Sequence, residues 1–406
     1  MALIVQKYGG SSVADAEKIK NIARRVAKAK DEGNQVVVVV SAMGDTTEDL
    51  IKLAYQISEQ PSDRELDVLL STGEIVSSTL LAMVLGSLGH RAISLTGAQA
   101  GIHTDSSYNR ARILRVDTKR VINELKKGNI VIVAGFQGVS GKRDVTTLGR
   151  GGSDTTAVAL AASLGAGACQ IFTDVEGVYT ADPRLVPEAR KLKEVSYEEM
   201  LELATYGARV MHNRAVELGW LYNVPILVAS SFSDSPGTTI CKEAAMEVRN
   251  KVIGIVHDTN VAKITVVGVP DHPGTAASIF EPLARANISV DTIVQNASIN
   301  SVADLTFTVA RSDLLKAMSI VEPVARSVGG KQCISDSTLA KVSVVGTGME
   351  NTPGYAARMF RALYQHGINI QLITTSEIRI TCIISEDKVT DAVRALHQAF
   401  ELEKET

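Results

Sequence analysis

Up to about residue 235, short runs of apolar residues alternate with segments whose apolar residues recur at helical spacing. The most extreme run is QVVVVVSAMG at residues 35–44, in which five valines follow one another. A strand that is apolar on both faces must be covered on both faces, as in a parallel sheet between helices. Further runs follow at intervals that leave room for helices: RAISLTG, NIVIVAGFQG, QIFTDVEGVY and VPILVASSF. The pattern predicts an α/β fold with a mostly parallel sheet covered by helices on both faces.

Composition limits the class of protein. The 406 residues exceed one typical domain, so two or three domains are expected. Hydrophobic residues make up 45% and charged residues 21%, as in soluble globular proteins. A net charge of −3 gives no footprint for nucleic acid, and no apolar run approaches the roughly 20 residues of a membrane span. Because MALIVQKYGG enters a strand at once, we expect no signal peptide, no membrane or nucleic-acid partner and a cytoplasmic location.

The four cysteines carry little functional signal. Cys169, Cys241, Cys333 and Cys382 stand far apart, with no C-x-x-C pair. This spacing argues against a structural zinc site or a disulfide framework and fits a reducing compartment. Because they mostly lie in apolar, strand-like runs, we expect structural thiols rather than a nucleophile.

An internal repeat begins near residue 260. The segment AKITVVGVPDHPGTAASIFEPLARANISV at 262–290 aligns with AKVSVVGTGMENTPGYAARMFRALYQHGINI at 340–370. Each copy reads as a strand, a Pro-Gly turn, a helix and further strands, which predicts two small α+β domains with antiparallel sheets. The predicted domains are 1–240, 260–335 and 338–402, with a junction over 234–260.

The stretch VQKYGGSS, residues 5–12, ends the first strand with a cation and two glycines. Gly9 and Gly10 allow backbone N–H groups to approach an anion, the helix start beyond them adds donors, and Lys7 could neutralise a phosphate. The alternative is an ordinary strand-to-helix turn with a surface lysine. Neither G-x-x-x-x-G-K-[ST] nor G-x-G-x-x-G occurs here, so phosphate binding would follow another scheme.

A second glycine-rich turn, TLGRGGSDTTAVALAASLGA at 147–166, also precedes a helix. Arg150 offers a planar fork for a carboxylate or phosphate. Asp154 lies at the helix start, where an aspartate can also be a plain N-cap. Two basic, glycine-rich turns in one parallel-sheet domain favour a shared anion site over capping alone.

Three further segments place polar side chains near strand ends, where ligands of such sheets bind. FTDVEGVYTADPR at 172–184 is dense in hydrogen-bonding groups, which suits a nucleotide, although it also reads as a polar turn ended by proline. LLSTGEIVSS at 69–78 places Glu74 near Gly73, read here as a helix start, as either a dipole partner or a ligand for a cation. SAMGDTTEDL at 41–50 offers Ser41 and Thr47 in a glycine turn.

Taken together, these stretches resemble the aspartate kinases of the amino-acid kinase family. The matching segments, in order, are VQKYGGSSV, VVVVVSAMGDTTEDL, TGE, GRGGSDTTA and TDVEGVYTADPR, followed by two repeats that look like ACT domains. The resemblance covers essentially the whole chain. One departure is Arg209, where related enzymes often carry lysine near the nucleotide, so its role is left open.

The resemblance implies an enzyme that moves the γ-phosphate of ATP to the side-chain carboxylate of aspartate, with Mg²⁺ on the phosphates. Lys7 and Asp154 would be catalytic, and no side chain is expected to be a dedicated metal ligand. The nucleotide residues would be Gly9, Gly10, Thr173, Asp174, Tyr179 and Arg184. The aspartate residues would be Ser41, Thr47, Glu74 for the ammonium group, Arg150 for a carboxylate, Gly151, Gly152 and Ser153.

The resemblance also implies regulation by lysine and threonine, bound between the two repeats. The implied effector residues are Asp271, Ser289, Val290, Asp291 and Gln295 in the first repeat and Asn369, Ile370, Ser376 and Glu377 in the second. Without the resemblance, both repeats read as plain structural domains. We expect a homodimer or higher oligomer through the ACT domains, or an assembly with a separate ACT-only subunit started at Met246. The alternatives are a kinase for acetylglutamate or glutamate, and a non-catalytic amino-acid sensor.

Overall fold

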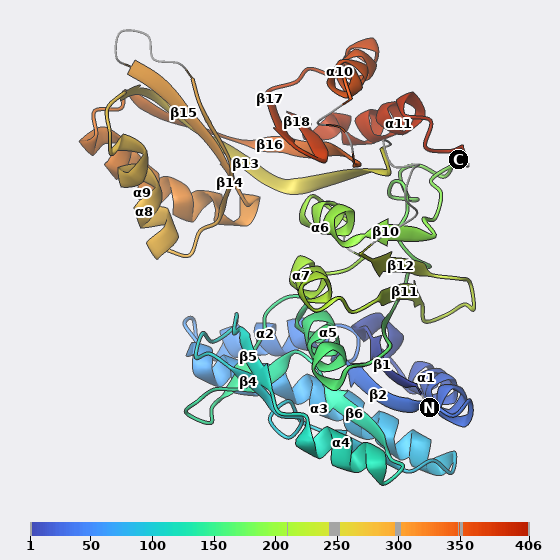
Figure 1. The fold of residues 1–406 in the computed structure, drawn as a ribbon. Helices are drawn as coiled ribbons and strands as arrows, with labels where there is room; N and C mark the ends of the chain where they lie inside the picture. Colours follow the sequence, from blue (N-terminus) through green and yellow to red (C-terminus); the bar gives the residue numbers. More distant parts are fainter. Residues whose placement is uncertain are drawn as a thin grey trace. The chain divides into compact units, whose positions relative to one another are not determined.

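The computed structural model describes residues 2–208, 210–242, 252–296, 302–347, 349 and 352–404, so Arg209 and Met246 lie outside the described residues. The chain divides into two compact units (Figure 1). Unit 1 contains Met1–Tyr179 and Lys191–Glu247, and unit 2 contains Thr180–Arg190 and Val248–Thr406. Each unit is described by itself.

Unit 1 is built on an eight-stranded sheet in the order β10-β12-β11-β9-β1-β2-β6-β3. The strands are β1 (Leu3–Tyr8), β2 (Gln35–Val40), β3 (Ala92–Leu95), β6 (Ile130–Ala134), β9 (Ala168–Thr173), β10 (Glu194–Ser196), β11 (Ile226–Ser230) and β12 (Thr238–Cys241). The pairing is parallel throughout except between β11 and β12. This confirms the predicted mostly parallel sheet.

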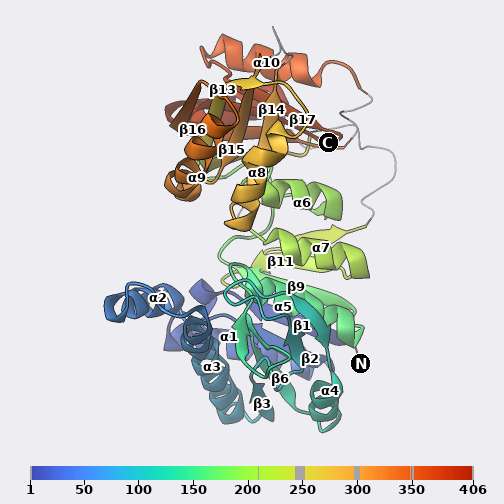
Figure 2. The ribbon, with the colours of Figure 1, turned by 90° about the vertical axis from the view of Figure 1, so that its left-hand side faces the viewer.

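Helices cover both faces of this sheet because its central strands are apolar on both sides. They are α1 (Ala16–Asp31), α2 (Thr46–Ile57), α3 (Asp63–Ser87), α4 (Lys119–Lys126), α5 (Gly152–Leu164), α6 (Tyr197–Thr205) and α7 (Asn213–Tyr222), with a short 3-10 turn η1 (Gly10–Ser12). Val36, Val38 and Val40 pack with residues of α1 and α3, which lie next to one another (Figure 2). On the other face, α5 packs against β1, β2 and β9. The valine run is fully buried, as its composition predicts.

A second sheet of unit 1 was not predicted from the sequence. Its order is β5-β4-β7-β8, with β4 (Ile102–Thr104), β5 (Ile113–Val116), β7 (Gln137–Val139) and β8 (Val145–Thr147). These strands are three or four residues long and carry buried polar pairs, such as the hydroxyls of Thr104 and Thr146 at 2.6 Å. Such strands lack the continuous apolar run or regular alternation that marks a strand in a sequence.

Within the described residues, α3 is the single helix long and apolar enough to cross a membrane by length and composition. It packs instead against β3, β6 and β8, and it buries Asp67 and Glu74. Asp67 accepts hydrogen bonds from the backbone and hydroxyl groups of Thr147. A helix that buries two carboxylates, one of them fully hydrogen-bonded, and has a sheet along one side has the features of a core helix.

Unit 2 contains a six-stranded antiparallel sheet formed by both repeats, in the order β14-β15-β13-β16-β18-β17. The strands are β13 (Gly254–Pro270), β14 (Val290–Gln295), β15 (Val302–Val309), β16 (Gln332–Val345), β17 (Leu372–Ser376) and β18 (Arg379–Ser385). The helices are α8 (Thr275–Arg285), α9 (Leu314–Ser327), α10 (Tyr355–Gln365) and α11 (Val389–Ala399), with 3-10 turns η2 (Arg311–Asp313) and η3 (Glu386–Lys388). The long strands β13 and β16 pair over most of their lengths, from Gly254 opposite Val345 to Val267 opposite Gln332, so the repeats share one sheet.

The segment 180–190 belongs to unit 2, although the strands that precede and follow it belong to unit 1. Ala181 and Val186 lie in the apolar core of the second repeat. The Thr180 hydroxyl lies 3.0 Å from His397 Nε2, and Arg190 Nε donates to the Leu402 carbonyl at 2.9 Å. Nothing in the sequence pattern indicated this attachment.

Candidate active site

A cavity of about 260 Å³ in unit 1 lies where β1 and β2 end and α5 begins. All the predicted catalytic and aspartate residues line it, together with the two glycines of the first turn: Lys7, Gly9, Gly10, Ser41, Thr47, Glu74, Arg150, Gly151, Gly152, Ser153 and Asp154. Five lining residues were not predicted: Ala42, Gly44, Glu48, Phe136 and Gly149. Five separate stretches of the sequence, at residues 7–10, 41–48, 74, 136 and 149–154, therefore meet at one site.

Lys7 and Asp154 form an ion pair at the base of this site. Lys7 Nζ lies 2.7 Å from Asp154 Oδ1, and both side chains are 11% exposed. Lys7 is held by β1, which pairs with β2 on one side and β9 on the other. Asp154 lies in the first turn of α5, but Gly151 holds the N-cap position, so the plain capping interpretation of Asp154 is wrong.

The second glycine turn requires its glycines. Gly149 and Gly151 have φ of 76° and 72°, a left-handed conformation that favours glycine. A Cβ on Gly151 would lie 2.2 Å from Cγ of His212, and one on Gly152 would lie 2.9 Å from Leu148 Cβ. The turn therefore packs its bare backbone against Leu148 and against His212, the N-cap residue of α7, and leaves Arg150 exposed at the cavity.

Glu74 is the buried anion of the cavity. It lies in the middle of α3 rather than at a helix start, so the dipole interpretation is wrong; Gly73 is needed because a Cβ there would lie 2.7 Å from Ala42 Cβ. Ala42 N–H donates to Glu74 Oε1 at 3.1 Å, while Oε2 is buried without a hydrogen-bond partner among the described residues. Burial raises the pKa of Glu74 to about 8. A carboxylate in this position is stabilised by an incoming cation.

Backbone groups of the first glycine turn already form hydrogen bonds within the protein, which the sequence did not predict. Gly9 N–H donates to the Phe172 carbonyl at 3.3 Å, which joins the turn to the end of β9. Gly10 lies against the loop after β2, because a Cβ there would lie 3.0 Å from the Ala42 carbonyl, and its own carbonyl accepts from Gly44 N–H at 3.1 Å. Gly9 thus fixes the position of the turn with its N–H group.

The predicted nucleotide residues divide between the two units. Thr173 ends β9 beside β1, and its hydroxyl donates to Asp174 at 3.0 Å. Tyr179 pairs with Lys191 through an isolated bridge in unit 1, and burial raises its pKa. Thr173, Asp174 and Tyr179 are not among the residues that line the 260 Å³ cavity. Arg184 lies in unit 2, where its Nη2 donates to Asp182 at 2.8 Å.

Known proteins share both parts of this chain. The amino acid kinase family model matches residues 2–230, and the ACT domain model matches residues 264–323 and 342–400. An aspartokinase of Pseudomonas aeruginosa is 52% identical over 406 residues, covering 99% of this chain and 98% of that protein. The chain belongs to the aspartokinases of the amino acid kinase family.

Solved aspartokinases have the same fold. Aspartate kinase from Synechocystis is 42% identical with a TM-score of 0.56, covering 98% of this chain and 70% of that one. E. coli aspartokinase III in complex with lysine and aspartate, a T-state, is 25% identical with a TM-score of 0.74, covering 98% and 99%. The predicted amino-acid kinase fold with C-terminal ACT domains is confirmed, and the chain is an enzyme, a kinase with a carboxyl acceptor.

In each ACT repeat the expected Pro-Gly turn precedes the first helix, which is α8 in the first repeat and α10 in the second. Gly274 and Gly354 cap these helices with φ of 98° and 110°. Next to the first turn, Gln295 Nε2 donates to Asp271 at 3.4 Å. The other predicted effector residues are exposed or half-buried along β14, β17 and the segments next to them: Ser289, Val290, Asp291, Asn369, Ile370, Ser376 and Glu377.

Side chains of each repeat also contact a strand of the other repeat. Asp291 forms an ion pair with Lys341 of β16, and Gln371 accepts from Lys263 of β13 at 2.7 Å. The two lysines are equivalent under the repeat alignment. Asp291, one of the predicted effector residues, is therefore paired with a cation of the protein itself.

Proposed function

We propose that the chain transfers the γ-phosphate of ATP to the side-chain carboxylate of L-aspartate, giving 4-phospho-L-aspartate. This is the first step toward lysine, threonine and methionine. The observation that carries the proposal is the arrangement of one cavity, where the Lys7–Asp154 pair lies with the unpartnered Oε2 of buried Glu74. The name of the Pseudomonas aeruginosa relative and the aspartate bound to the E. coli enzyme support the choice of acceptor.

The chemistry needs positioning more than proton transfer, because the acceptor carboxylate is already a nucleophilic anion. The difficulty is to bring it against a triphosphate and to stabilise charge on the transferring phosphoryl group. Lys7 supplies that positive charge, and Asp154 keeps the ammonium oriented from the first turn of α5. The start of α5 favours anionic groups, and Ser153 N–H would add a donor there, whereas Gly152 N–H already donates to the Gly149 carbonyl at 2.9 Å.

The aspartate substrate would be held by groups of both signs. Glu74 Oε2 would receive the ammonium group, which supplies the cation that this buried oxygen lacks among the described residues. Arg150, exposed at the same cavity, would bind the α-carboxylate, and Ser41 and Thr47 would complete the polar lining. The cavity is slightly smaller than the typical ligand pocket of about 300–1,000 Å³, which suits a small acid.

The nucleotide would be bound by Thr173, Asp174 and Tyr179 after β9, while the nucleotide role of Arg184, which lies in unit 2, stays a prediction. Among the described residues, no group of three or more His, Cys, Asp or Glu side chains could hold a metal alone. Mg²⁺ is commonly bound through substrate phosphates and one or two carboxylates. Asp154, which lines the same cavity, would be available as a protein carboxylate, and the ion would neutralise phosphate charge.

The ACT repeats would make the enzyme responsive to end products. Lysine and threonine are the proposed effectors, bound near the Pro-Gly turns and Asp271, in an oligomer formed through the repeats. The lysine complex of the E. coli enzyme supports lysine as one effector. The proposed domains remain 1–240 for catalysis, and 260–335 and 338–402 for regulation.

A coupled assay of ADP formation tests the proposal. The purified full chain is incubated with ATP and Mg²⁺, and with aspartate, glutamate or N-acetylglutamate in turn. Phosphorylation of aspartate alone supports the proposal. Activity with glutamate or acetylglutamate but not aspartate would replace it with the neighbouring kinase function, and no activity with any acid would favour the sensor.

A further inference from the structure

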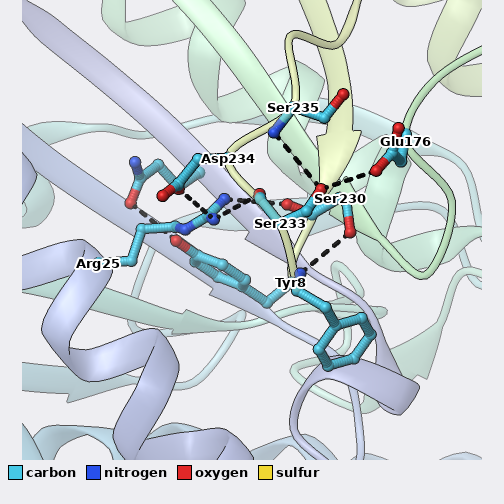
Figure 3. A network of polar contacts seen from close by, with 9 residues as sticks. Tyr8, Arg25, Glu176, Ser230, Ser233, Asp234 and Ser235 are labelled. Atoms are coloured by element: carbon cyan, nitrogen blue, oxygen red, sulfur yellow. Dashed lines mark hydrogen bonds and ion pairs between the residues drawn. The ribbon is translucent and has the colours of Figure 1, made fainter.

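An arginine on α1 holds the loop that follows β11. Arg25 Nη1 donates to the Ser230 carbonyl at 2.9 Å, and Nη2 donates to the Ser233 carbonyl at 2.9 Å (Figure 3). Nη2 also lies 3.2 Å from Asp234 Oδ1. The side chain is 24% exposed, while Asp234 is fully exposed, so the carbonyl bonds are the better protected part of this contact.

The same guanidinium lies on an aromatic stack beneath the candidate active site. Its central carbon is 4.8 Å from the ring centre of Phe172, and Phe172 stacks on Tyr8 with ring centres 4.9 Å apart. Tyr8 directly follows Lys7, and Phe172 directly precedes Thr173. Arg25 therefore supports the ends of the two strands that carry the proposed catalytic lysine and the first nucleotide residue.

The loop held by Arg25 contacts the nucleotide segment on its other side. Ser233 Oγ donates to Glu176 at 3.1 Å, and hydrogen bonds to serines of this loop lower the pKa of Glu176 (Figure 3). The Ser231 N–H donates to the Thr173 carbonyl at 2.8 Å, and its hydroxyl lies 2.6 Å from that of Ser12. The loop thus joins α1, the first glycine turn and the 173–176 segment.

We propose that Arg25 is a positioning residue for the nucleotide: it fixes the 230–235 loop and the Tyr8–Phe172 stack, which in turn fix Thr173 and Asp174. This rests on the proposed nucleotide role of that segment. An arginine is required because one planar group must bridge two carbonyls while lying on an aromatic ring. A lysine carries its donors on a single nitrogen and has no planar face for the ring, whereas Arg25 reaches the two carbonyls from two different nitrogens.

The test compares Arg25→Lys and Arg25→Ala with Arg24→Ala. Arg24 is the matched control, since it is exposed on the same helix and its side chain donates to the neighbouring Asn21 side chain rather than to the 230–235 loop. Both Arg25 variants should raise the KM for ATP and the Kd for ADP by about ten- to a hundredfold, by misplacing a binding group. The KM for aspartate should change by less than about twofold, and Arg24→Ala should match wild type.

Two further measurements separate positioning from a general loss of structure. Added guanidinium ion should partly restore the ADP affinity of Arg25→Ala. The deleted group lines a second cavity, also of about 260 Å³ but distinct from the candidate active site; this second cavity lies beside the loop and could admit the ion. Ser233→Ala, which leaves Arg25 intact, should raise the KM for ATP in the same direction. Equal changes in both KM values, or unchanged ADP binding in Arg25→Lys, would overturn the inference. If the wild type shows no aspartate kinase activity but binds ADP more tightly than the Arg25 variants, the inference about Arg25 stands and the proposed function is refuted.

Discussion

Replacing Glu74 by glutamine should stabilise the substrate-free protein while weakening aspartate binding. Burial raises the pKa of Glu74 from 4.5 to about 8. Each unit of difference between the folded-state and unfolded-state pKa corresponds to about 1.4 kcal/mol. Holding the ionised carboxylate in the substrate-free site therefore costs on the order of 5 kcal/mol. Glutamine keeps the shape and can still accept from Ala42 N–H, but it never ionises.

The sign of this effect gives it a pH signature. Because the folded-state pKa lies above the unfolded value, the folded protein holds the proton more tightly. The wild type is therefore most stable, relative to the variant, below about pH 4.5, and it loses stability as pH rises toward about 8. The stability difference should grow by about 1.4 kcal/mol per pH unit and then level off.

Calorimetric melting of wild type and Glu74→Gln from about pH 5 to 9 measures this difference. In a domain of this size, each kcal/mol of unfolding free energy shifts the Tm by about 2–4 °C. Glu48→Gln is the control, since Glu48 is exposed at the same cavity. In wild type, the KM for aspartate should fall as pH rises toward 8, because the ammonium group needs an ionised partner. In Glu74→Gln it should be higher and lack this dependence. A melting difference that does not change with pH would refute the reasoning.

Two other substitutions test the glycine turn and the regulatory unit. Gly151→Ala should cost about 1–2 kcal/mol for the left-handed backbone, plus the clash with His212, and should lower kcat/KM for aspartate. Gly141→Ala, with nothing within 4 Å of the added Cβ, should match wild type; equal behaviour of the two would contradict the packing argument. Asp271→Ala should weaken inhibition by lysine or threonine, against a typical coupling of about 1–3 kcal/mol, and leave uninhibited kcat unchanged. Inhibition curves for Asp271→Ala and Glu377→Ala would show which repeat binds which amino acid, and full sensitivity in both variants would move the sites elsewhere.

The sequence allowed the central sheet and the candidate site to be predicted because their signals are local. The valine run shows a strand buried on both faces, and the glycines beside Lys7 and Asp154 mark two turns whose strands and helices converge in a parallel sheet. The prediction failed where a long-range contact decides the structure. Glu74 was placed at a helix start, since Gly73 normally interrupts a helix, whereas packing against Ala42 keeps it inside α3.

Two other features were hidden for the same reason. Arg25 looks like one of several surface cations on an amphipathic helix, and its role depends on carbonyls more than 200 residues away. The stretch 172–184 also reads as a polar turn ended by proline, but the attachment of 180–190 to unit 2 depends on apolar side chains of the second repeat and on His397. Neither partner can be identified from the pattern of a single sequence.

The most direct test of the proposed reaction is to trap its product. An acyl phosphate reacts with hydroxylamine, so the enzyme with ATP, Mg²⁺ and aspartate should yield the side-chain hydroxamate of aspartate, identified by mass spectrometry against both isomers. Lys7→Met should stay folded, since the lysine lies near the end of β1, and should form this product about 10²–10³-fold more slowly, as on removal of one preorganised donor. Hydroxamate at the α-carboxylate, or wild-type turnover in Lys7→Met, would contradict the account.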